Sequence, residues 1–433
     1  MRFARIPSIL LLALGLAVAS QLQATVVGVS EPAPSLTAAR IARLPASQRA
    51  AWTAYLERSQ QQEMRDRASL AAERKGLTSI PPLPRGQGNA YSIPLNRDPA
   101  WYASAEARHI GDVIVSFQTP GGGWSKNLDM ATTARLPGQS YAGNNLSRYL
   151  SPDDFDTPSD PDWNYVGTLD NDATNTQIHY LARLSAGNPG AAGDAYRASY
   201  IRGIRYLLAA QFPNGGWPQV WPLEGGYHDA ITFNDNALTE SATVLTNAAS
   251  GSGDYAFVPA ELRRQASTAA AHALECILAT QIMVHGQLTL WAQQHDALTL
   301  APVSGRNYEP AAMATGESTD VLLYLMSLPK PNKAVVDAVR DGVVYLKATA
   351  IYGQEWAGGR GDAAGRHLSP KAGAGPIWPR YLSLTTEKPI FGDRDKTIHD
   401  DVNEISLERR NGYSWFSAVP QRAIDAYTSW VAR

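Results

Sequence analysis

The chain has 433 residues, a formal net charge of −2 and 18% charged residues. This length is ample for a large hydrophobic core, and the lack of a basic excess argues against nucleic acid or an anionic membrane as partner. The single cysteine, Cys276, excludes an intrachain disulfide; it lies in an apolar helical pattern and is expected to be a buried, inert thiol.

Residues 1–24 have the features of a signal peptide. Arg2 and Arg5 give a positively charged start, and residues 9–19 form an apolar stretch too short to span a membrane comfortably. Cleavage is expected after Ser20 or Ala24. A membrane anchor is the less favoured alternative, because no second apolar span follows. The sequence therefore predicts a secreted or periplasmic protein.

Residues 25–98 are predicted to form a helical extension and a linker. The stretch 35–75 is rich in Ala, Arg, Glu and Gln, with helical spacing of its apolar residues, so one or two helices strapped onto the main body are expected. Residues 80–97 carry repeated prolines and glycines, which favour an extended connection. The catalytic domain is expected to occupy residues 99–433.

From residue 99 onward, a helix–turn–tryptophan pattern repeats. Helices are predicted over 103–117, 196–210, 271–280 and 335–350, with further apolar helical runs at 174–184, 238–249 and 318–326. The tryptophans that follow the first four are Trp124, Trp217, Trp291 and Trp356. Repeated helical hairpins predict a mainly α protein with an α/α toroid and long site-forming loops at one end; an irregular all-α domain is the alternative.

A turn-rich stretch at residues 214–238 has the composition of a site. Its glycines permit tight turns, and Trp217 offers a flat face on which a sugar ring can stack. Asp229 and Asp235 supply oxygens suited to Ca²⁺ or to hydroxyl groups. Taken alone, the stretch supports equally well an ordered loop in which the tryptophan is a plug and the acidic residues form turns.

Five segments resemble, in the right order, those of the family 10 pectate lyases. They are GGGWSKNLDM (121–130), TLDNDATNTQIHYLARL (168–184), QFPNGGWPQVWPLEGGYHDAITFNDNAL (211–238), WAQQHDALTLAPVSGRNYEP (291–310) and PIFGDRDKTIHDDVNEISLERRNGYSW (389–415). The resemblance implies an (α/α)₃ toroid-like domain, Ca²⁺-dependent cleavage of de-esterified polygalacturonate and an arginine as base. Two positions depart from the family pattern: Asp172 replaces the usual glycine, and Ser125 replaces a common proline.

The chemistry of this cleavage explains the residue types. Removal of H5 of a galacturonate expels O4 without water, but this proton is weakly acidic until the adjacent carboxylate is neutralised. A divalent cation with hard oxygen ligands does this as a Lewis acid. By the resemblance, the expected ligands of Ca²⁺ are Asp170, Asn171 and Asp235. The alternative is that the two aspartates are plain helix N-caps.

By the same resemblance, Arg306 is the predicted catalytic base. A guanidinium is normally protonated at any ordinary pH, so this role requires neighbouring positive charge that favours its neutral form. Without the resemblance, a guanidinium that only binds a substrate carboxylate would be the default interpretation. His228 and His295 are the alternative bases by residue type, and His295 could equally hold a loop in place.

A polyanionic substrate favours cationic subsites, because arginine pairs with carboxylates through two parallel hydrogen bonds. The predicted substrate-binding residues are Lys126, Trp217, Asp229, Arg380, Arg394 and Tyr413. Two other functions stay open: a glycoside hydrolase that uses Asp170 and Asp235 as its carboxylate pair, and a non-catalytic pectin-binding protein. The expected partner is the pectate chain, and the protein is expected to be a monomer.

Overall fold

The computed structural model describes residues 25–86, 93–359 and 361–431, so the predicted signal peptide lies outside the described residues. No helix within those ranges has the length and apolar character needed to cross a membrane. The α-helices are α1 Ala38–Ile41, α2 Ala46–Arg74, α3 Ala105–Phe117, α4 Asn175–Gly187, α5 Asp194–Ala210, α6 Ala237–Ser250, α7 Ala260–Thr280, α8 Thr315–Ser327, α9 Lys333–Ala348, α10 Leu407–Gly412 and α11 Gln421–Trp430.

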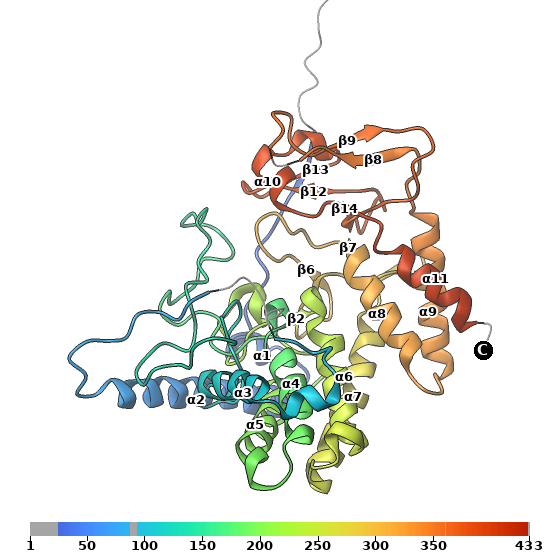
Figure 1. Cartoon of the computed structure of the whole chain (residues 1–433). Coiled ribbons are helices and arrows are strands. Elements are labelled where there is room, and N and C mark those ends of the chain that lie inside the picture. Colours follow the sequence, from blue (N-terminus) through green and yellow to red (C-terminus); the bar gives the residue numbers. More distant parts are fainter. Residues whose placement is uncertain (1–24, 87–92, 360, 432–433) are drawn as a thin grey trace, which may run out of the picture.

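Three helical hairpins, α4–α5, α6–α7 and α8–α9, form the body of the protein (Figure 1). The first helices of the hairpins pack side by side in one row, α4 against α6 and α6 against α8, and the second helices pack in a parallel row. Helix α3 packs on the first hairpin, and α11 packs on the last. The predicted helices are confirmed, although α7 begins at Ala260 rather than at residue 271.

Buried tryptophans complete the ends of four helices, α3, α5, α7 and α9. The Nε1 of Trp124 donates to the Ile114 carbonyl of α3 over 2.7 Å, and Trp217 donates in the same way to Leu207 of α5 over 2.8 Å. Carbonyls in the last turn of a helix have few backbone partners, and each indole N–H satisfies one of them. The Leu207 carbonyl also accepts from Gln211 N over 3.1 Å. Trp291 does this for Ile277 of α7, and Trp378 does it for Leu346 of α9.

The fourth tryptophan of the predicted repeat, Trp356, does not complete the end of a helix. Trp356 lies in strand β8, Gln354–Ala357, which forms a hairpin with β9, His367–Pro370. This hairpin separates α9 from Trp378, which takes the structural position expected of Trp356. The repeat is real, but an inserted hairpin moves its last tryptophan further along the chain.

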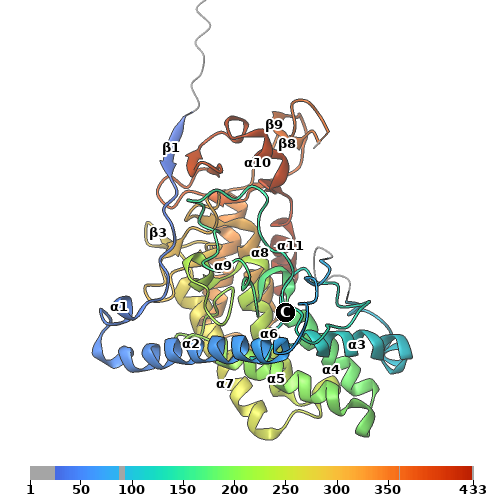
Figure 2. The same ribbon diagram turned by 90° about the vertical axis from the view of Figure 1, so that its left-hand side faces the viewer.

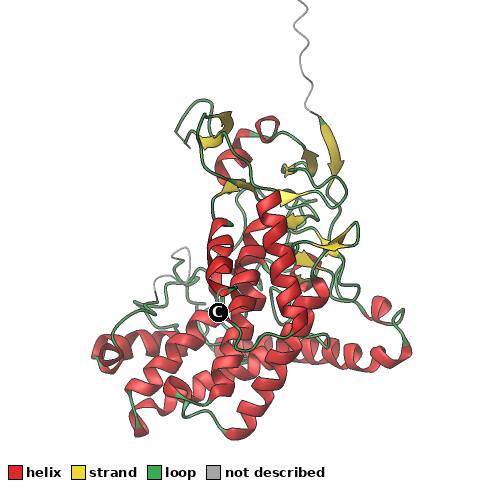
Figure 3. Cartoon of the chain, turned by 90° about the vertical axis from the view of Figure 1, so that its right-hand side faces the viewer, coloured by secondary structure: helices red, strands yellow, loops and turns green. Residues whose placement is uncertain are grey.

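Short antiparallel strands lie mainly at one end of the helical body, where the connecting loops gather (Figure 3). They form the sheets β1-β13-β12, β2-β5-β6, β7-β11, β10-β14, β3-β4 and β8-β9. Their remaining bounds are β1 Val26–Val29, β2 Ile231–Thr232, β3 Met283–Val284, β4 Gln287–Leu288, β5 Gln294–His295, β6 Pro302–Val303, β7 Met313–Ala314, β10 Trp378–Pro379, β11 Tyr381–Leu382, β12 Phe391–Gly392, β13 Thr397–His399 and β14 Phe416–Ser417.

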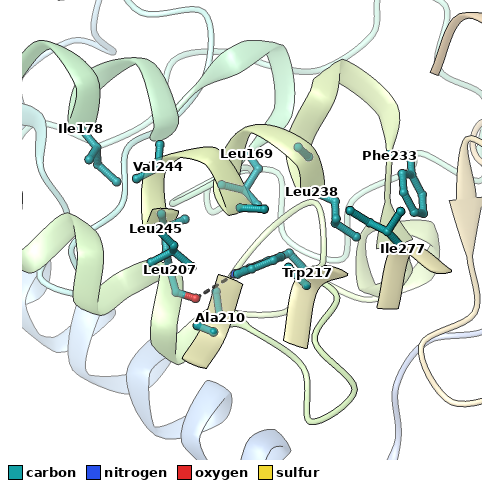
Figure 4. Close-up of a cluster of buried hydrophobic side chains, with 14 of the residues drawn as sticks. Leu169, Ile178, Leu207, Ala210, Trp217, Phe233, Leu238, Val244, Leu245 and Ile277 are labelled. Atoms are coloured by element: carbon teal, nitrogen blue, oxygen red, sulfur yellow. Dashed lines mark hydrogen bonds between the residues drawn. The ribbon is translucent and has the colours of Figure 1, made fainter. Parts of the chain in front are cut away.

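The hydrophobic core fills the space between the two rows of helices. Figure 4 shows Trp217 among Leu207, Leu238 and Ile277, which come from three different helices, and shows its bond to the Leu207 carbonyl. Cys276 is buried here as predicted, and burial raises the pKa of its thiol to about 12, so it stays protonated.

The N-terminal extension packs on this body rather than standing apart. Helix α2 runs across it (Figure 2), and its Trp52 and Tyr55 rings lie 5.4 and 4.9 Å from the ring of Phe212. Tyr55 also donates its hydroxyl to the Ala210 carbonyl at the end of α5, over 2.9 Å. The expectation of helices strapped onto the body is confirmed by α1 and α2, while a domain boundary near residue 99 stays a prediction.

Candidate active site

Two turns with unusual backbone geometry begin the site. Residues 170–172 precede α4 and residues 234–236 precede α6, and the two turns lie next to each other. Asn171 and Asp235 both have left-handed backbones, with φ of 52° and 50°. Such conformations are costly for non-glycine residues and gather at functional sites. Neither Asp170 nor Asp235 caps a helix: the N-caps are Thr174 and Asn236, so the simple capping interpretation is wrong.

Asp170 and Asp235 are hydrogen-bonded to each other and have opposite protonation tendencies. Burial is the largest single influence and alone would raise the pKa of Asp170. The Lys126 ammonium, the hydrogen bond with Asp235 and the charge of Arg306 together outweigh burial and hold the pKa of this carboxyl well below its usual range. Gln219 Nε2 also donates to Asp170 Oδ1 over 3.0 Å. Burial, followed by the charge of Asp170, raises the pKa of Asp235 well above its usual range.

Amide side chains surround this pair. Asn171 donates its backbone N–H to Asp235 Oδ2 over 3.2 Å and its side-chain amide to Asn127 Oδ1 over 2.9 Å. Asn234 Nδ2 donates to the same Asp235 oxygen over 2.9 Å. The structure thus brings together the three predicted metal ligands and adds Asn127 and Asn234 as further oxygen-bearing neighbours.

Lys126 contacts both Asp170 and the aromatic ring of Tyr165. Its ammonium lies 3.4 Å from the centre of the Tyr165 ring, within the range of a cation–π interaction. The Tyr165 hydroxyl is 2.8 Å from Nε2 of His228. Burial lowers the pKa of His228 to about 3, and the side chain is buried against Tyr165, so it has no open approach to a substrate.

Arg306 lies in a tight turn between Gly305 and Glu309. Gly305 N donates to the Glu309 carbonyl over 2.9 Å, and Glu309 N donates to the Arg306 carbonyl over 2.8 Å. The guanidinium is 30% exposed; its Nη1 is 3.6 Å from Glu309 Oε1, and its Nε is 3.9 Å from Asp156 Oδ2. Burial opposes its charge, but Glu309 and nearby tyrosines raise the pKa of Arg306 well above its ordinary value. In this state it is an acid, not a base.

The charge of Arg306 lowers the pKa of Asp170 and of Asp235, although other groups act on each carboxyl more strongly. Strands β2, β6 and β7 lie around the starts of α6 and α8 (Figure 1). The loop of Arg306 follows β6.

One other predicted cation, Arg380, reaches the same region. Arg380 Nη2 is 3.3 Å from Asn234 Oδ1, pairs with Glu317 at 2.5 Å, and its guanidinium lies 4.6 Å from the Tyr413 ring. The Tyr413 hydroxyl donates to Glu309 Oε1 over 2.8 Å, which connects this group to the turn of Arg306.

Arg394 lies further out, beside the aromatic residues of the rim. It pairs with Glu408 at 2.7 Å, and its guanidinium lies 4.6 Å from the Tyr149 ring and 5.4 Å from the Tyr308 ring. Tyr308 in turn holds Arg306 Nη1 with a 3.3 Å contact.

Two predicted substrate-binding residues have other roles. Trp217 is fully buried and holds the end of α5, so it presents no face to a sugar. Asp229 is buried and accepts from Leu36 N and Gly225 N, both over 2.9 Å, so its carboxylate is turned toward the N-terminal segment. His295 is also buried: it accepts from Ala292 N and bonds the Leu300 carbonyl, which fixes a loop.

Sequence reasoning missed several neighbours of the site: Asn127, Tyr165, Gln219, Asn234, Glu309 and Glu317. Asn127, Gln219, Asn234 and Glu309 lie inside the segments that carry the family resemblance, so those segments held the signal without distinguishing which side chains face inward. Tyr165 and Glu317 lie outside them and become visible only through tertiary contacts.

Comparison with known proteins shows the family of the chain. The pectic acid lyase family model matches residues 118–424, which is more than half of the chain, so the chain belongs to this family. It is a lyase that acts on polysaccharides, with pectate lyase activity. No curated protein matches the chain.

The particular structures that it resembles are two of a family 10 polysaccharide lyase from Cellvibrio cellulosa. The wild-type structure has a TM-score of 0.64 and 29% identity, over 81% of this chain and 100% of that one. A mutant in complex with trigalacturonic acid has the same score and identity, over 79% of this chain and 99% of that one. The α/α toroid predicted from the sequence is thereby confirmed.

Proposed function

We propose that this protein cleaves de-esterified polygalacturonate by Ca²⁺-assisted β-elimination to give unsaturated oligogalacturonides. The observation that supports the proposal is a series of contacts between the Arg306 turn and the turn of Asp235. Glu309, which pairs with Arg306, accepts from the Tyr413 hydroxyl. Arg380 lies over the Tyr413 ring and contacts Asn234, whose amide donates to Asp235. The bound trigalacturonic acid in the related lyase supports a galacturonate polymer as substrate.

The donor set suits part of the coordination of a Ca²⁺ ion. Asp170, Asn171 and Asp235 offer hard oxygen ligands, and a cation between the carboxylates would relieve the repulsion that raises the pKa of Asp235. Within the described ranges, no group of three or more His, Cys, Asp or Glu side chains could hold a metal alone. The amide of Asn171 and a substrate carboxylate would therefore complete the site. When bound, the ion neutralises the uronate and stabilises the charge that develops on it.

The remaining residues bind the chain and move the proton. Arg306 in its neutral form takes H5 from the galacturonate, the electron pair forms the C4–C5 double bond, and the C4–O4 bond breaks. The departing O4 takes a proton from solvent and becomes the hydroxyl of the released chain end. The pKa of Arg306 is high without substrate because Glu309 and tyrosines surround it, so the base role requires that the site's positive charges lower that pKa in the loaded complex. Lys126, Arg380, Arg394 and Tyr413 would bind the uronate carboxylates and hydroxyls along the chain.

The test is the ultraviolet absorbance of the unsaturated product, which a glycoside hydrolase does not form. Polygalacturonate should give this absorbance with Ca²⁺ and lose it in excess chelator, and highly methylated pectin should react more slowly. Full turnover in chelator would remove Ca²⁺ from the mechanism. Faster cleavage of methylated pectin would contradict the proposed cationic cleft.

We also propose that the protein is exported and acts as a monomer. Residues 1–24 have the pattern of a signal peptide. N-terminal sequencing of protein from the culture medium and the periplasm tests export: Thr25 as first residue supports cleavage after Ala24. Sedimentation analysis tests the monomeric state, and an intact Met1 with all activity in the cytoplasm would overturn export.

A further inference from the structure

The first described residues, 25–40, form an extended segment that we name the N-terminal strap (Figure 2). Its strand β1 pairs with β13, and Ser30 N donates to the Lys396 carbonyl over 2.8 Å. The strap precedes the region, residues 118–424, that matches the family model. Below β13 it contacts three loops, each of which leads to the candidate active site.

The first contact is with the loop that carries Arg306. Ser304 is buried, and its hydroxyl donates to the Glu31 carbonyl of the strap. Only Gly305 separates Ser304 from Arg306, and the turn that follows is closed by backbone bonds to Glu309. The strap therefore fixes the start of the turn that presents the proposed base.

The second contact is with the loop that supports Asp170. Asp229 bridges strap and loop, because its two oxygens accept from Leu36 N and from Gly225 N, each over 2.9 Å. Next to it, the His228 carbonyl accepts from Gln219 N over 2.9 Å. The Gln219 side chain donates to Asp170 Oδ1 over 3.0 Å. A short series of bonds thus connects the strap to a proposed metal ligand.

The third contact is an ion pair that holds the loop between β5 and β6. Arg40 Nη2 is 2.6 Å from Asp296 Oδ2, whose side chain is only 4% exposed. The other Asp296 oxygen accepts from Leu298 N and Thr299 N over 3.0 and 2.8 Å. Strand β6 follows this loop and leads directly to Ser304, so the ion pair supports the Arg306 turn from a second side.

We propose that the N-terminal strap sets the position of Arg306 relative to Asp170, with Arg40 and Asp229 as positioning residues for the elimination reaction. The inference rests on the proposed function, in which these two groups act on one galacturonate. A misplacement of about 1 Å by a distant change can cost ~10²-fold in rate, so a segment that ties both halves together acts on catalysis through geometry.

A stabilising role alone does not explain Asp229. Burial raises the pKa of Asp229 to about 6, so its charged form at neutral pH weakens the folded state. Its two oxygens nevertheless accept from two separate segments, an arrangement that serves position better than stability.

The experiment compares Arg40→Ala with Arg43→Ala in the mature full-length chain. Arg43 is an exposed arginine three residues away, which makes it a matched control for loss of charge. For each variant, kcat and KM on polygalacturonate with saturating Ca²⁺, the melting temperature, and amide hydrogen exchange of residues 225–230 and 304–309 are measured. Arg40→Lys, which keeps the charge, and Asp229→Asn, which keeps the shape, complete the set.

We expect Arg40→Ala to lower kcat by about tenfold or more, with KM within about twofold of wild type and faster exchange in both segments. Arg40→Lys should recover much of kcat, Asp229→Asn should behave like Arg40→Ala, and Arg43→Ala should match wild type. A lowered melting temperature with unchanged kcat and exchange would reduce the strap to a structural role and overturn the inference. Failure of the proposed function would give a different result, because the wild-type protein itself would then form no Ca²⁺-dependent unsaturated product. The hydrogen-exchange data would still test the role of the strap.

Discussion

Asp170 and Asp235 are hydrogen-bonded to each other across the turns that begin α4 and α6, and only one of them favours ionisation. Lys126 supports the charge of Asp170, whereas burial and that same charge keep a proton on Asp235. Two acidic groups held this close repel each other when both are ionised. A divalent cation would replace the proton and hold both carboxylates in their charged forms.

Asp235→Asn should therefore weaken Ca²⁺ binding. Loss of a proposed ligand should cost at least about tenfold in affinity, since even partners outside the coordination shell contribute ~10–100-fold at metal sites. Calorimetric titration of Ca²⁺ measures the change, with Asp337→Asn on the outer helix α9 as control. Wild-type Ca²⁺ affinity in Asp235→Asn would remove Asp235 from the ligand set.

Trp217→Phe should affect stability rather than substrate binding. The change keeps an aromatic ring in the core but removes the indole hydrogen bond to the buried Leu207 carbonyl, which still accepts from Gln211 N. The loss of this bond should cost about 0.5–1.5 kcal/mol. Thermal unfolding and KM measure the two effects separately. Trp291→Phe removes the equivalent bond to Ile277 and should give a similar loss. A raised KM with unchanged unfolding would instead restore Trp217 to the substrate site.

Glu224 should make the protein less stable at alkaline pH. Burial raises the pKa of Glu224 from 4.5 to about 8, although Tyr165 N donates to its Oε1 over 2.5 Å. Between these pH values the folded state binds a proton that the unfolded chain has lost. Its contribution to stability is therefore complete below about pH 4.5 and is lost as the pH rises toward 8.

Glu224→Gln removes this dependence. The variant should gain ~1–2 kcal/mol relative to wild type above pH 8, with a smaller difference near pH 5. Denaturant unfolding at both pH values measures it. An equal difference at the two pH values would show that Glu224 does not titrate in this range. Glu57→Gln, at an exposed position on α2, serves as the control.

The helical body could be predicted because its signal is local. Amphipathic spacing marks each helix, and the tryptophan that follows completes the end of that helix within a few turns of chain. The prediction failed for the last unit of the repeat, because the β8–β9 hairpin lies between α9 and Trp378. Nothing in the local pattern distinguishes Trp356 from Trp378, the tryptophan that completes the end of α9. The short strands have no clear period, since most of them pair over two residues.

Asp170, Asn171 and Asp235 were predicted as a group from the family resemblance. They meet in the structure because they precede α4 and α6, which pack side by side, so order along the chain becomes proximity in space. Trp217 and Asp229 were assigned from the composition of a turn-rich stretch, which does not tell which side chains face inward. Their partners, Leu207 and Leu36, come from other segments and appear only in the folded protein.

Arg306 is the residue whose role the kinetics can decide. If it is the base, Arg306→Ala should lower kcat by ~10²–10⁴-fold with a smaller change in KM, and folding should be intact by circular dichroism. Arg306→Lys keeps a positive charge but places it elsewhere and without the planar group, so a base role predicts loss of kcat in this variant too. A binding role predicts mainly a raised KM and substantial recovery by lysine. The kcat and KM of both variants are measured on polygalacturonate at alkaline pH with saturating Ca²⁺. Arg410→Ala, on the short helix α10, is the control. Near-normal kcat in Arg306→Ala would exclude Arg306 from proton transfer. Because His228 is buried against Tyr165, the base would then have to be a second arginine. Arg380 is the candidate, since it contacts Asn234 beside the metal-ligand candidates.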